Sequence, residues 1–146
     1  MEKLDRRILG LLARDGRMSY TDIGKETGLS TSAAQQRVRR LEQRGAIKGY
    51  HARVAPEAIG LELTAFISIK PFEPNQPDDH PERLREIDEI VSCYSVAGDA
   101  NYLLKVQVAN TAALEVLLAR IRAVGGVSTQ STIVLSTPYE DRPPAI

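Results

Sequence analysis

The sequence has one cysteine, few aromatic residues and no long apolar run. Because Cys93 has no second cysteine to pair with, an intrachain disulfide and all chemistry that needs a cysteine pair are excluded. Cys93 lies in the apolar stretch 91–96, where a free cysteine is expected to be a small buried side chain. No segment approaches the roughly 18 apolar residues of a membrane helix, and residues 1–12 are too charged for a signal peptide. A cytoplasmic protein with no membrane association is therefore predicted.

Catalytic and metal-binding motifs are also lacking. The two histidines, His51 and His80, occur in none of the spacings typical of zinc sites, and no nucleophile elbow, phosphate-binding loop or dinucleotide fingerprint is present. His80 follows Asp78 and Asp79, but a charged cluster between prolines is expected to be a solvated loop. The sequence thus predicts no catalytic residue, no metal site, no cofactor and no enzymatic activity.

Charged residues of both signs are present, but they are unevenly distributed along the chain. The formal net charge is zero. Residues 1–53 nevertheless hold 12 lysines and arginines against 6 acidic residues, whereas residues 54–146 hold 7 against 13. A basic first third on a neutral chain indicates that this part meets a polyanion.

The first 46 residues have the pattern of three short helices. Apolar residues recur at helical spacing from Leu4 to Leu12, and Asp15-Gly16 ends this segment. Ser19 is placed to cap a second helix, which Gly28 ends, and Ser30 is placed to cap a third that runs roughly over 31–44. A glycine-containing turn between the second and third helices is typical of a helix-turn-helix domain, predicted here over residues 1–46.

The rest of the chain alternates as strands do. Residues 47–54 are expected to form a strand within a linker that covers 47–61. Beyond it, strand and helix patterns follow in the order β-α-β-β-α-β, which is that of a ferredoxin-like sheet with both helices on one face. The predicted fold class is therefore α+β, with the helix-turn-helix followed by a ferredoxin-like domain over 62–146.

The open face of that sheet is expected to be apolar. Phe66, Tyr94, Leu103 and Val134 should lie on the face away from the helices. A solvent-facing sheet with this much apolar area usually has a partner, and the simplest partner is a second copy related by a twofold axis. A homodimer is therefore predicted.

The third predicted helix has a polar outward face. Arginine and glutamine have the side-chain geometry to hydrogen-bond guanine and adenine edges in the major groove. Arg37 lies nearer the buried stripe and is interpreted as a phosphate contact or an internal salt bridge. The residues expected to contact double-stranded DNA are Ser30, Ser32, Gln35, Gln36, Arg37, Arg39, Arg40 and Gln43.

Several motifs together resemble the Lrp/AsnC family, also called feast/famine regulators. They are Leu4-Asp5-Arg6-Arg7-Ile8-Leu9, Asp15-Gly16-Arg17, Gly28-Leu29-Ser30-x-Ser32, Arg37-Val38-x-x-Leu41-Glu42, Gly45-x-Ile47-x-Gly49-Tyr50 and Tyr102-Leu103-Leu104-x-Val106. The likeness also includes Pro56, Gly60 and Gly98, and so spans nearly the whole chain. The resemblance implies a DNA-binding transcriptional regulator that dimerises through its C-terminal domain, often with assembly of dimers into octamers.

The same resemblance implies an amino acid or related metabolite as effector, held near the turn between the second and third strands of the sheet. In this sequence the residues concerned are Gly98, Asp99, Ala100, Asn101 and Tyr102, together with Thr132 on the last strand. The family pattern has an aspartate where this chain has Asn101, which offers a neutral oxygen rather than a charge. Asp99 is a candidate to supply that charge, and a simple β-turn is the alternative interpretation of the segment.

Two other functions remain open from the sequence. Some proteins of the same fold decarboxylate haem precursors, although the arginines of the third helix argue against that activity here. A small-molecule-binding module that regulates a protein partner would explain the C-terminal domain but not the helix-turn-helix.

Overall fold

The computed structural model describes residues 1–146, which form two compact units. The first consists of Met1–Arg53 together with Pro138–Ile146, and the second of Val54–Thr137. The sequence had assigned all residues after 61 to the α+β domain, so the last nine residues group differently from that expectation. Arg53 contributes to this grouping, since its guanidinium donates to the carbonyl oxygen of Glu140 at 3.2 Å and pairs with Asp141 at 3.8 Å.

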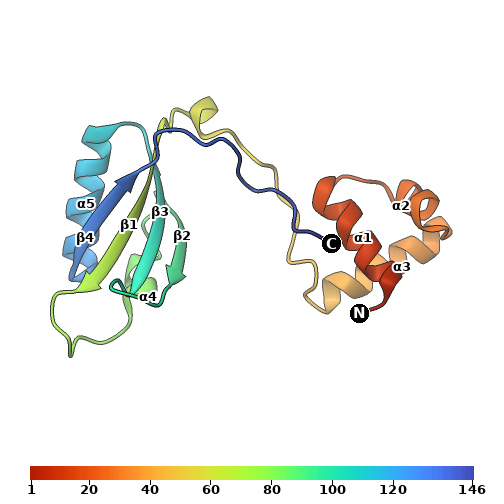
Figure 1. Cartoon of the computed structure of the whole chain (residues 1–146), viewed down its shortest axis with the longest axis horizontal. Coiled ribbons are helices and arrows are strands. Elements are labelled where there is room, and N and C mark those ends of the chain that lie inside the picture. The colour runs from red at the N-terminus through yellow and green to blue at the C-terminus, as the bar shows by residue number, and fades with distance from the viewer. The chain divides into compact units, whose positions relative to one another are not determined.

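The helical unit contains α1 (Lys3–Arg14), α2 (Tyr20–Thr27) and α3 (Thr31–Gln43) (Figure 1). Both predicted N-caps are confirmed. The hydroxyl of Ser19 accepts a hydrogen bond from the amide of Asp22, and that of Ser30 accepts one from the amide of Ala33. These bonds satisfy amides that a helix start leaves without a partner, and so they fix where α2 and α3 begin.

The turn between α2 and α3 depends on two glycines. Gly28 ends α2 with a φ of 74°, a left-handed conformation that other residues adopt only with strain. Gly24 lies inside α2 directly against the turn, and a Cβ there would overlap the backbone oxygen of Leu29. The absence of a side chain at Gly24 therefore permits the close approach of α2 to the start of α3.

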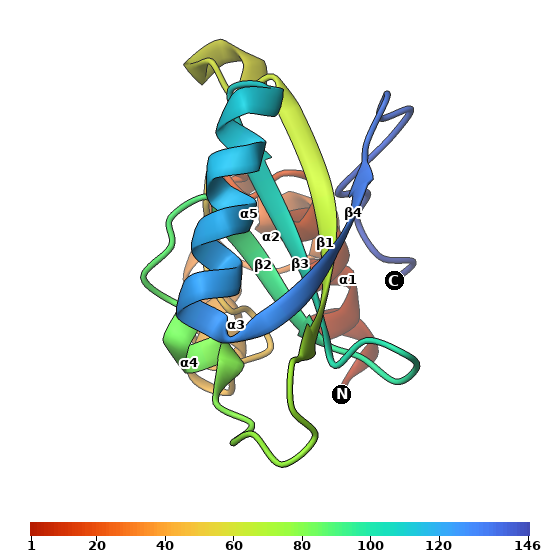
Figure 2. The same ribbon diagram turned by 90° about the vertical axis from the view of Figure 1, so that its left-hand side faces the viewer.

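The second unit begins with a 3₁₀ turn, Pro56–Ile59, and continues as a four-stranded antiparallel sheet with two helices. Its elements are β1 (Leu63–Pro71), α4 (His80–Leu84), β2 (Ile90–Ser95), β3 (Tyr102–Val108), α5 (Thr111–Gly125) and β4 (Val127–Ile133). The strand order is β2-β3-β1-β4, and α4 and α5 lie on the same side of the sheet (Figure 2). The predicted α+β, ferredoxin-like fold is confirmed.

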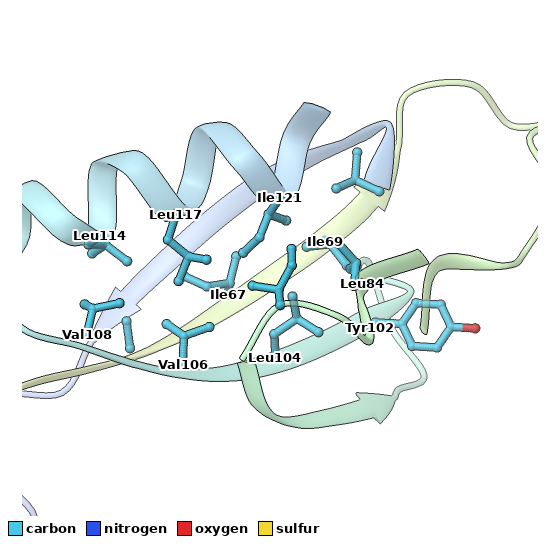
Figure 3. Packing of buried hydrophobic residues seen from close by; sticks show 13 residues of the cluster. Ile67, Ile69, Leu84, Tyr102, Leu104, Val106, Val108, Leu114, Leu117 and Ile121 are labelled. Carbon is cyan, nitrogen blue, oxygen red and sulfur yellow. The ribbon is translucent and has the colours of Figure 1, made fainter. Parts of the chain in front are cut away.

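The core of this unit lies between α5 and the sheet. Leu114, Leu117 and Ile121 of α5 point toward alternate side chains of β1 and β3 (Figure 3). The ring of Tyr102 closes one end of this core, and its hydroxyl points away from the other labelled side chains. Packing of the Tyr102 ring in the core thus places its hydroxyl at the surface beside the β2–β3 turn.

Three expectations about local structure are wrong. Residues 47–54 form no strand, because no other segment of the chain pairs with their backbone. Cys93 is exposed, because β2 is an edge strand and the short α4 leaves its helix-facing side partly open. His80 is only 1% exposed, because it begins α4 and turns inward against the ring of Tyr102, with 6.0 Å between ring centroids.

Candidate DNA-binding and effector sites

The outward face of α3 presents the polar side chains expected from the sequence. Ala34, Val38 and Leu41 are buried in the core of the helical unit. Arg39 and Arg40 are exposed, and neither forms an ion pair within the chain. Ser32, Gln36 and Gln43 are exposed on the same helix, and Gln35 is half-buried on its flank. This helix therefore offers two unpaired guanidinium groups and several amides to a ligand.

Arg37 has a different environment. Its Nη1 atom lies 2.8 Å from Glu2 Oε2 and 2.8 Å from Asp5 Oδ1, and the hydrogen bond to Glu2, then that to Asp5, raises the pKa of the guanidinium. Asp5 is only 7% exposed, and its second oxygen lies 3.5 Å from Arg44. Of the two roles expected for Arg37, the structure shows the internal salt bridge, which ties α3 to α1.

The hydroxyl of Ser30 is also mostly occupied by hydrogen bonds within the chain. Its oxygen accepts the capping bond from the Ala33 amide at 3.2 Å and lies 3.3 Å from the hydroxyl oxygen of Ser32. Ser32 itself has no capping role and is exposed at the start of α3. Of the two hydroxyls, that of Ser32 is the freer to meet a phosphate.

Tyr50 belongs to a motif seen in the sequence, but the sequence did not indicate its structural role. Its hydroxyl donates to Glu42 Oε1 at 2.9 Å, which anchors the segment after α3 to that helix. Burial disfavours the phenolate, and together with the bond to Glu42 it raises the pKa of Tyr50 to about 12. The motif Gly49-Tyr50 was attributed to a strand, whereas the side chain acts as a tether.

The expected effector segment forms the turn between β2 and β3. The amide of Asn101 donates to the carbonyl oxygen of Ile69, and the amide of Val96 donates to the carbonyl oxygen of Asn101, at 3.0 and 3.1 Å. A hollow of about 300 Å³ adjoins this turn. It is lined by Asp78, Ser95, Val96, Ala97, Gly98, Ala100, Asn101 and Tyr102.

Two residues of the expected effector set do not line this hollow. Asp99 points to Lys70, with 2.7 Å between the carboxylate and the ammonium group, and it is absent from the lining. Thr132 lies opposite Phe66 on β4, which is the far edge of the sheet from β2, and it is also absent. A single chain therefore brings together four of the six predicted residues, and the structure adds Asp78.

Asp78 belongs to a small polar cluster below the hollow. The hydroxyl of Tyr102 donates to Asp78 Oδ1 at 2.8 Å, which raises the pKa of Tyr102 because the phenol proton is held by a carboxylate. The Nδ1 atom of buried His80 lies 3.5 Å from the same oxygen but makes no hydrogen bond. The acidic loop was visible in the sequence, but nothing in its local pattern indicated its approach to Tyr102.

A second hollow, of about 450 Å³, separates α4 from the edge strand β2. Its lining includes Pro81, Arg85, Ile90 and Cys93, and partial desolvation at the hollow raises the pKa of the Cys93 thiol. No three histidine, cysteine or carboxylate side chains are grouped closely enough to hold a metal ion. None of the helices has the length and hydrophobicity to cross a membrane.

Comparison with known proteins covers nearly the whole chain. Residues 1–42 match the AsnC-type helix-turn-helix domain, and residues 64–144 match the Lrp/AsnC ligand binding domain. The HTH-type transcriptional regulator LrpA of Mycobacterium tuberculosis is 52% identical over 142 residues, 97% of this chain and 95% of LrpA. The leucine-responsive regulatory protein of Escherichia coli is 34% identical over 140 residues, 92% of this chain and 85% of that protein.

A solved structure is similar over the same extent. The feast or famine regulatory protein of M. tuberculosis, solved in complex with L-methionine, superimposes with a TM-score of 0.95 at 52% identity, covering 98% of this chain and 99% of that one. The family resemblance seen in the sequence is thereby confirmed. With a helix-turn-helix that presents unpaired arginines and an α+β unit of matching fold, the chain belongs to the Lrp/AsnC family of transcriptional regulators.

Proposed function

We propose that this protein is a sequence-specific DNA-binding transcriptional regulator whose α3 helix reads base edges in the major groove. The observation that carries the proposal is the exposure of Arg39 and Arg40 on α3 without an ion-pair partner. They belong to a stretch, 1–53, that has a net charge of +6. Arginine is the residue that most often contacts guanine edges in a bidentate manner, and the surrounding positive charge draws the unit to the phosphate backbone.

The DNA contacts divide into two kinds. Arg39, Arg40 and Gln36 are proposed to read bases, with Gln35 and Gln43 beside them on α3. Ser32 and Ser30, at the start of α3, are proposed to position the helix on a phosphate, because amides at a helix N-terminus favour an anion. Arg37 holds the helix in place through Glu2 and Asp5, and we propose that it reads no base.

We propose that the protein binds DNA as a homodimer. Tyr94 is a half-exposed side chain on the outer face of the sheet, and Phe66 and Leu103 lie partly open on the same face. Burying the outer face against a second copy removes this apolar area from water. Two copies of α3 then address major grooves about 34 Å or a multiple apart. Higher assembly, to an octamer, would add half-site contacts through effective concentration.

The α+β unit is proposed to sense an amino acid. The similar M. tuberculosis protein was solved with L-methionine, and this chain has a polar hollow at the β2–β3 turn. Gly98, Ala100, Asn101 and Tyr102 line that hollow, while Asp99 and Thr132 are proposed to reach the effector only in the assembled oligomer. Binding between dimers would couple effector concentration to assembly and so to promoter occupancy.

The test is binding of the full chain to DNA from its own upstream region, across a salt series and with a panel of amino acids. Specific binding that weakens steeply with salt is expected. The double variant Arg39→Ala/Arg40→Ala is expected to lose about thirtyfold or more in affinity, since each base contact contributes about 1–3 kcal/mol. The matched control Arg120→Ala/Arg122→Ala removes the same charge from α5 and is expected to bind as the wild type does.

Two results would contradict the proposal. Equal DNA affinity of the Arg39→Ala/Arg40→Ala variant and the wild type would show that α3 is not the reading surface. Absence of specific binding at low salt, with every amino acid tested, would favour the haem-precursor decarboxylase or the protein-regulating module instead. A visible absorption spectrum of the purified protein would then separate these two.

A further inference from the structure

The hollow at the β2–β3 turn is lined by a single ionisable carboxylate, and it does not come from the turn. Position 101 is an asparagine, and Asp99 is directed to Lys70 outside the lining. The carboxylate is that of Asp78, from the loop between β1 and α4. From this geometry we infer that Asp78 is the residue that binds the α-ammonium group of the effector, an inference that rests on the amino-acid sensing proposed above.

The side chain of Asp78 is held in position for this role. Its Oδ1 atom accepts the hydroxyl proton of Tyr102 at 2.8 Å, and the ring of Tyr102 is itself fixed at the end of the core. His80, 1% exposed, lies beneath with Nδ1 3.5 Å from the same oxygen. Because both neighbours lie on Oδ1, the second oxygen is left for a ligand, and the side chain is 70% exposed to receive one.

The loop that carries Asp78 is tied to the body of the unit. The amide of Gln76 donates to the carbonyl oxygens of Gly125 and Gly126, at 3.3 and 3.0 Å, at the end of α5. Arg83 donates to the Gly125 carbonyl at 3.4 Å from the other side of the loop. A carboxylate on an anchored loop gives up less conformational entropy on binding than one on a free loop, which favours recognition of a cation.

The rest of the hollow suits the other end of an amino acid. The hydroxyl of Ser95 and the side-chain amide of Asn101 can donate hydrogen bonds to an α-carboxylate, while no acidic side chain apart from Asp78 is present to repel it. The hydroxyl of Tyr102 positions the Asp78 carboxylate through their hydrogen bond. The ligand class is therefore a zwitterionic amino acid rather than a carboxylic acid that lacks the ammonium group.

The experiment measures binding of two probes to the full chain by calorimetry. One probe is L-methionine and the other is its desamino analogue, which keeps the carboxylate and the thioether. The variant Asp78→Asn retains an oxygen that can accept from Tyr102 but loses the charge. The control Asp79→Asn neutralises the adjacent carboxylate, which faces Arg83 at 3.8 Å and does not line the hollow.

L-methionine is expected to bind Asp78→Asn about tenfold to a hundredfold more weakly than it binds the wild type, the range typical of a charge-assisted hydrogen bond. Asp79→Asn is expected to bind as the wild type does. The desamino analogue is expected to bind wild type and Asp78→Asn equally, because it has no ammonium group to lose. Unchanged thermal unfolding and DNA affinity of Asp78→Asn without ligand would show that the fold is intact.

The inference is overturned if Asp78→Asn and the wild type bind L-methionine equally, or if Asp99→Asn loses affinity while Asp78→Asn keeps it. Either result would leave amino-acid sensing in place, because the wild type still binds. If the wild type binds neither L-methionine nor any other amino acid, the sensing proposal and the role of Asp78 fail together.

Discussion

The helical unit and the α+β unit differ in how their candidate sites are built. On α3, the exposed arginines and glutamines come from one continuous segment and stand at helical spacing. At the β2–β3 turn, the hollow combines the loop before α4 with the ends of β2 and β3, and its carboxylate is 24 residues from the tyrosine that holds it. A surface made by one element can be recognised from the sequence, whereas a hollow made by several requires the structure.

The largest expected effect tests whether the two units also unfold independently of each other. Leu41 belongs to the core of the helical unit and Leu104 to that of the sheet, and no residue is common to both cores. Leu41→Ala and Leu104→Ala are each expected to lower the free energy of unfolding of their own unit by about 2–5 kcal/mol. Hydrogen exchange resolved along the chain would measure the loss of protection unit by unit.

Leu135→Ala is the control for these core variants, because Leu135 is almost fully exposed and its truncation should change neither unit. If Leu41→Ala lowered protection in β1 and β3 as much as in α1, the two units would unfold together rather than independently.

A second prediction separates structural from reading arginines within the helical unit. Arg37→Met leaves the nearly buried carboxylate of Asp5 with only the longer contact to Arg44 and is expected to cost about 1–3 kcal/mol of unfolding free energy. Arg39→Ala is expected to change stability by less than about 0.5 kcal/mol but to weaken DNA binding by about 1–3 kcal/mol. Chemical denaturation and DNA titration on the same two variants measure both effects.

The expected results for the two variants are opposite. DNA affinity measured well below the unfolding midpoint should be nearly unchanged in Arg37→Met. A large loss of affinity in that variant, with normal stability, would return Arg37 to the DNA-contacting set.

The smallest effect concerns Tyr50 at alkaline pH. The structure favours the protonated phenol, and its pKa is raised from 10.0 to about 12. The stabilisation is therefore complete below about pH 10 and is lost as the pH rises from 10 to 12. Because the side chain is half exposed, solvent screening limits the effect to about 1 kcal/mol or less.

The stability difference between the wild type and Tyr50→Phe is thus expected to shrink between about pH 9 and about pH 11.5. Denaturation midpoints of both proteins at the two pH values measure it, and absorbance of the tyrosinate during titration reports the pKa directly. An equal difference at both pH values would remove the ionisation of Tyr50 as its cause.

Much of the fold followed from local signals in the sequence. Ser19 and Ser30 were correctly expected to cap α2 and α3, because the capping bond joins residues only three positions apart. The order of strands and helices in the sheet followed from periodicity and turn residues. Signals of this kind depend on neighbours in the chain and need no knowledge of tertiary contacts.

The remaining features depend on distant contacts. Residues 47–54 alternate as a strand does, but alternation creates a strand only where another backbone is available to pair. Cys93 stands in an apolar stretch whose exposure follows from its place on the edge strand. Asp78 and His80 occur in a segment of turn-forming residues, and their contacts with Tyr102 join positions more than twenty residues apart. The sequence therefore predicted the turn residues of the candidate effector site, but it did not predict that Asp78 supplies the carboxylate.

The separation of roles along α3 has a consequence for how this protein can change over evolutionary time. The inward residues Ala34, Val38 and Leu41 hold the helix, Arg37 ties it to α1, and Gly24 allows it to approach α2. The outward residues Gln36, Arg39, Arg40 and Gln43 contribute to none of these contacts, so substitutions there cost little stability. Under the proposed DNA-reading role of α3, a duplicated copy of the gene would acquire a new operator through these four positions, while its fold stayed the same.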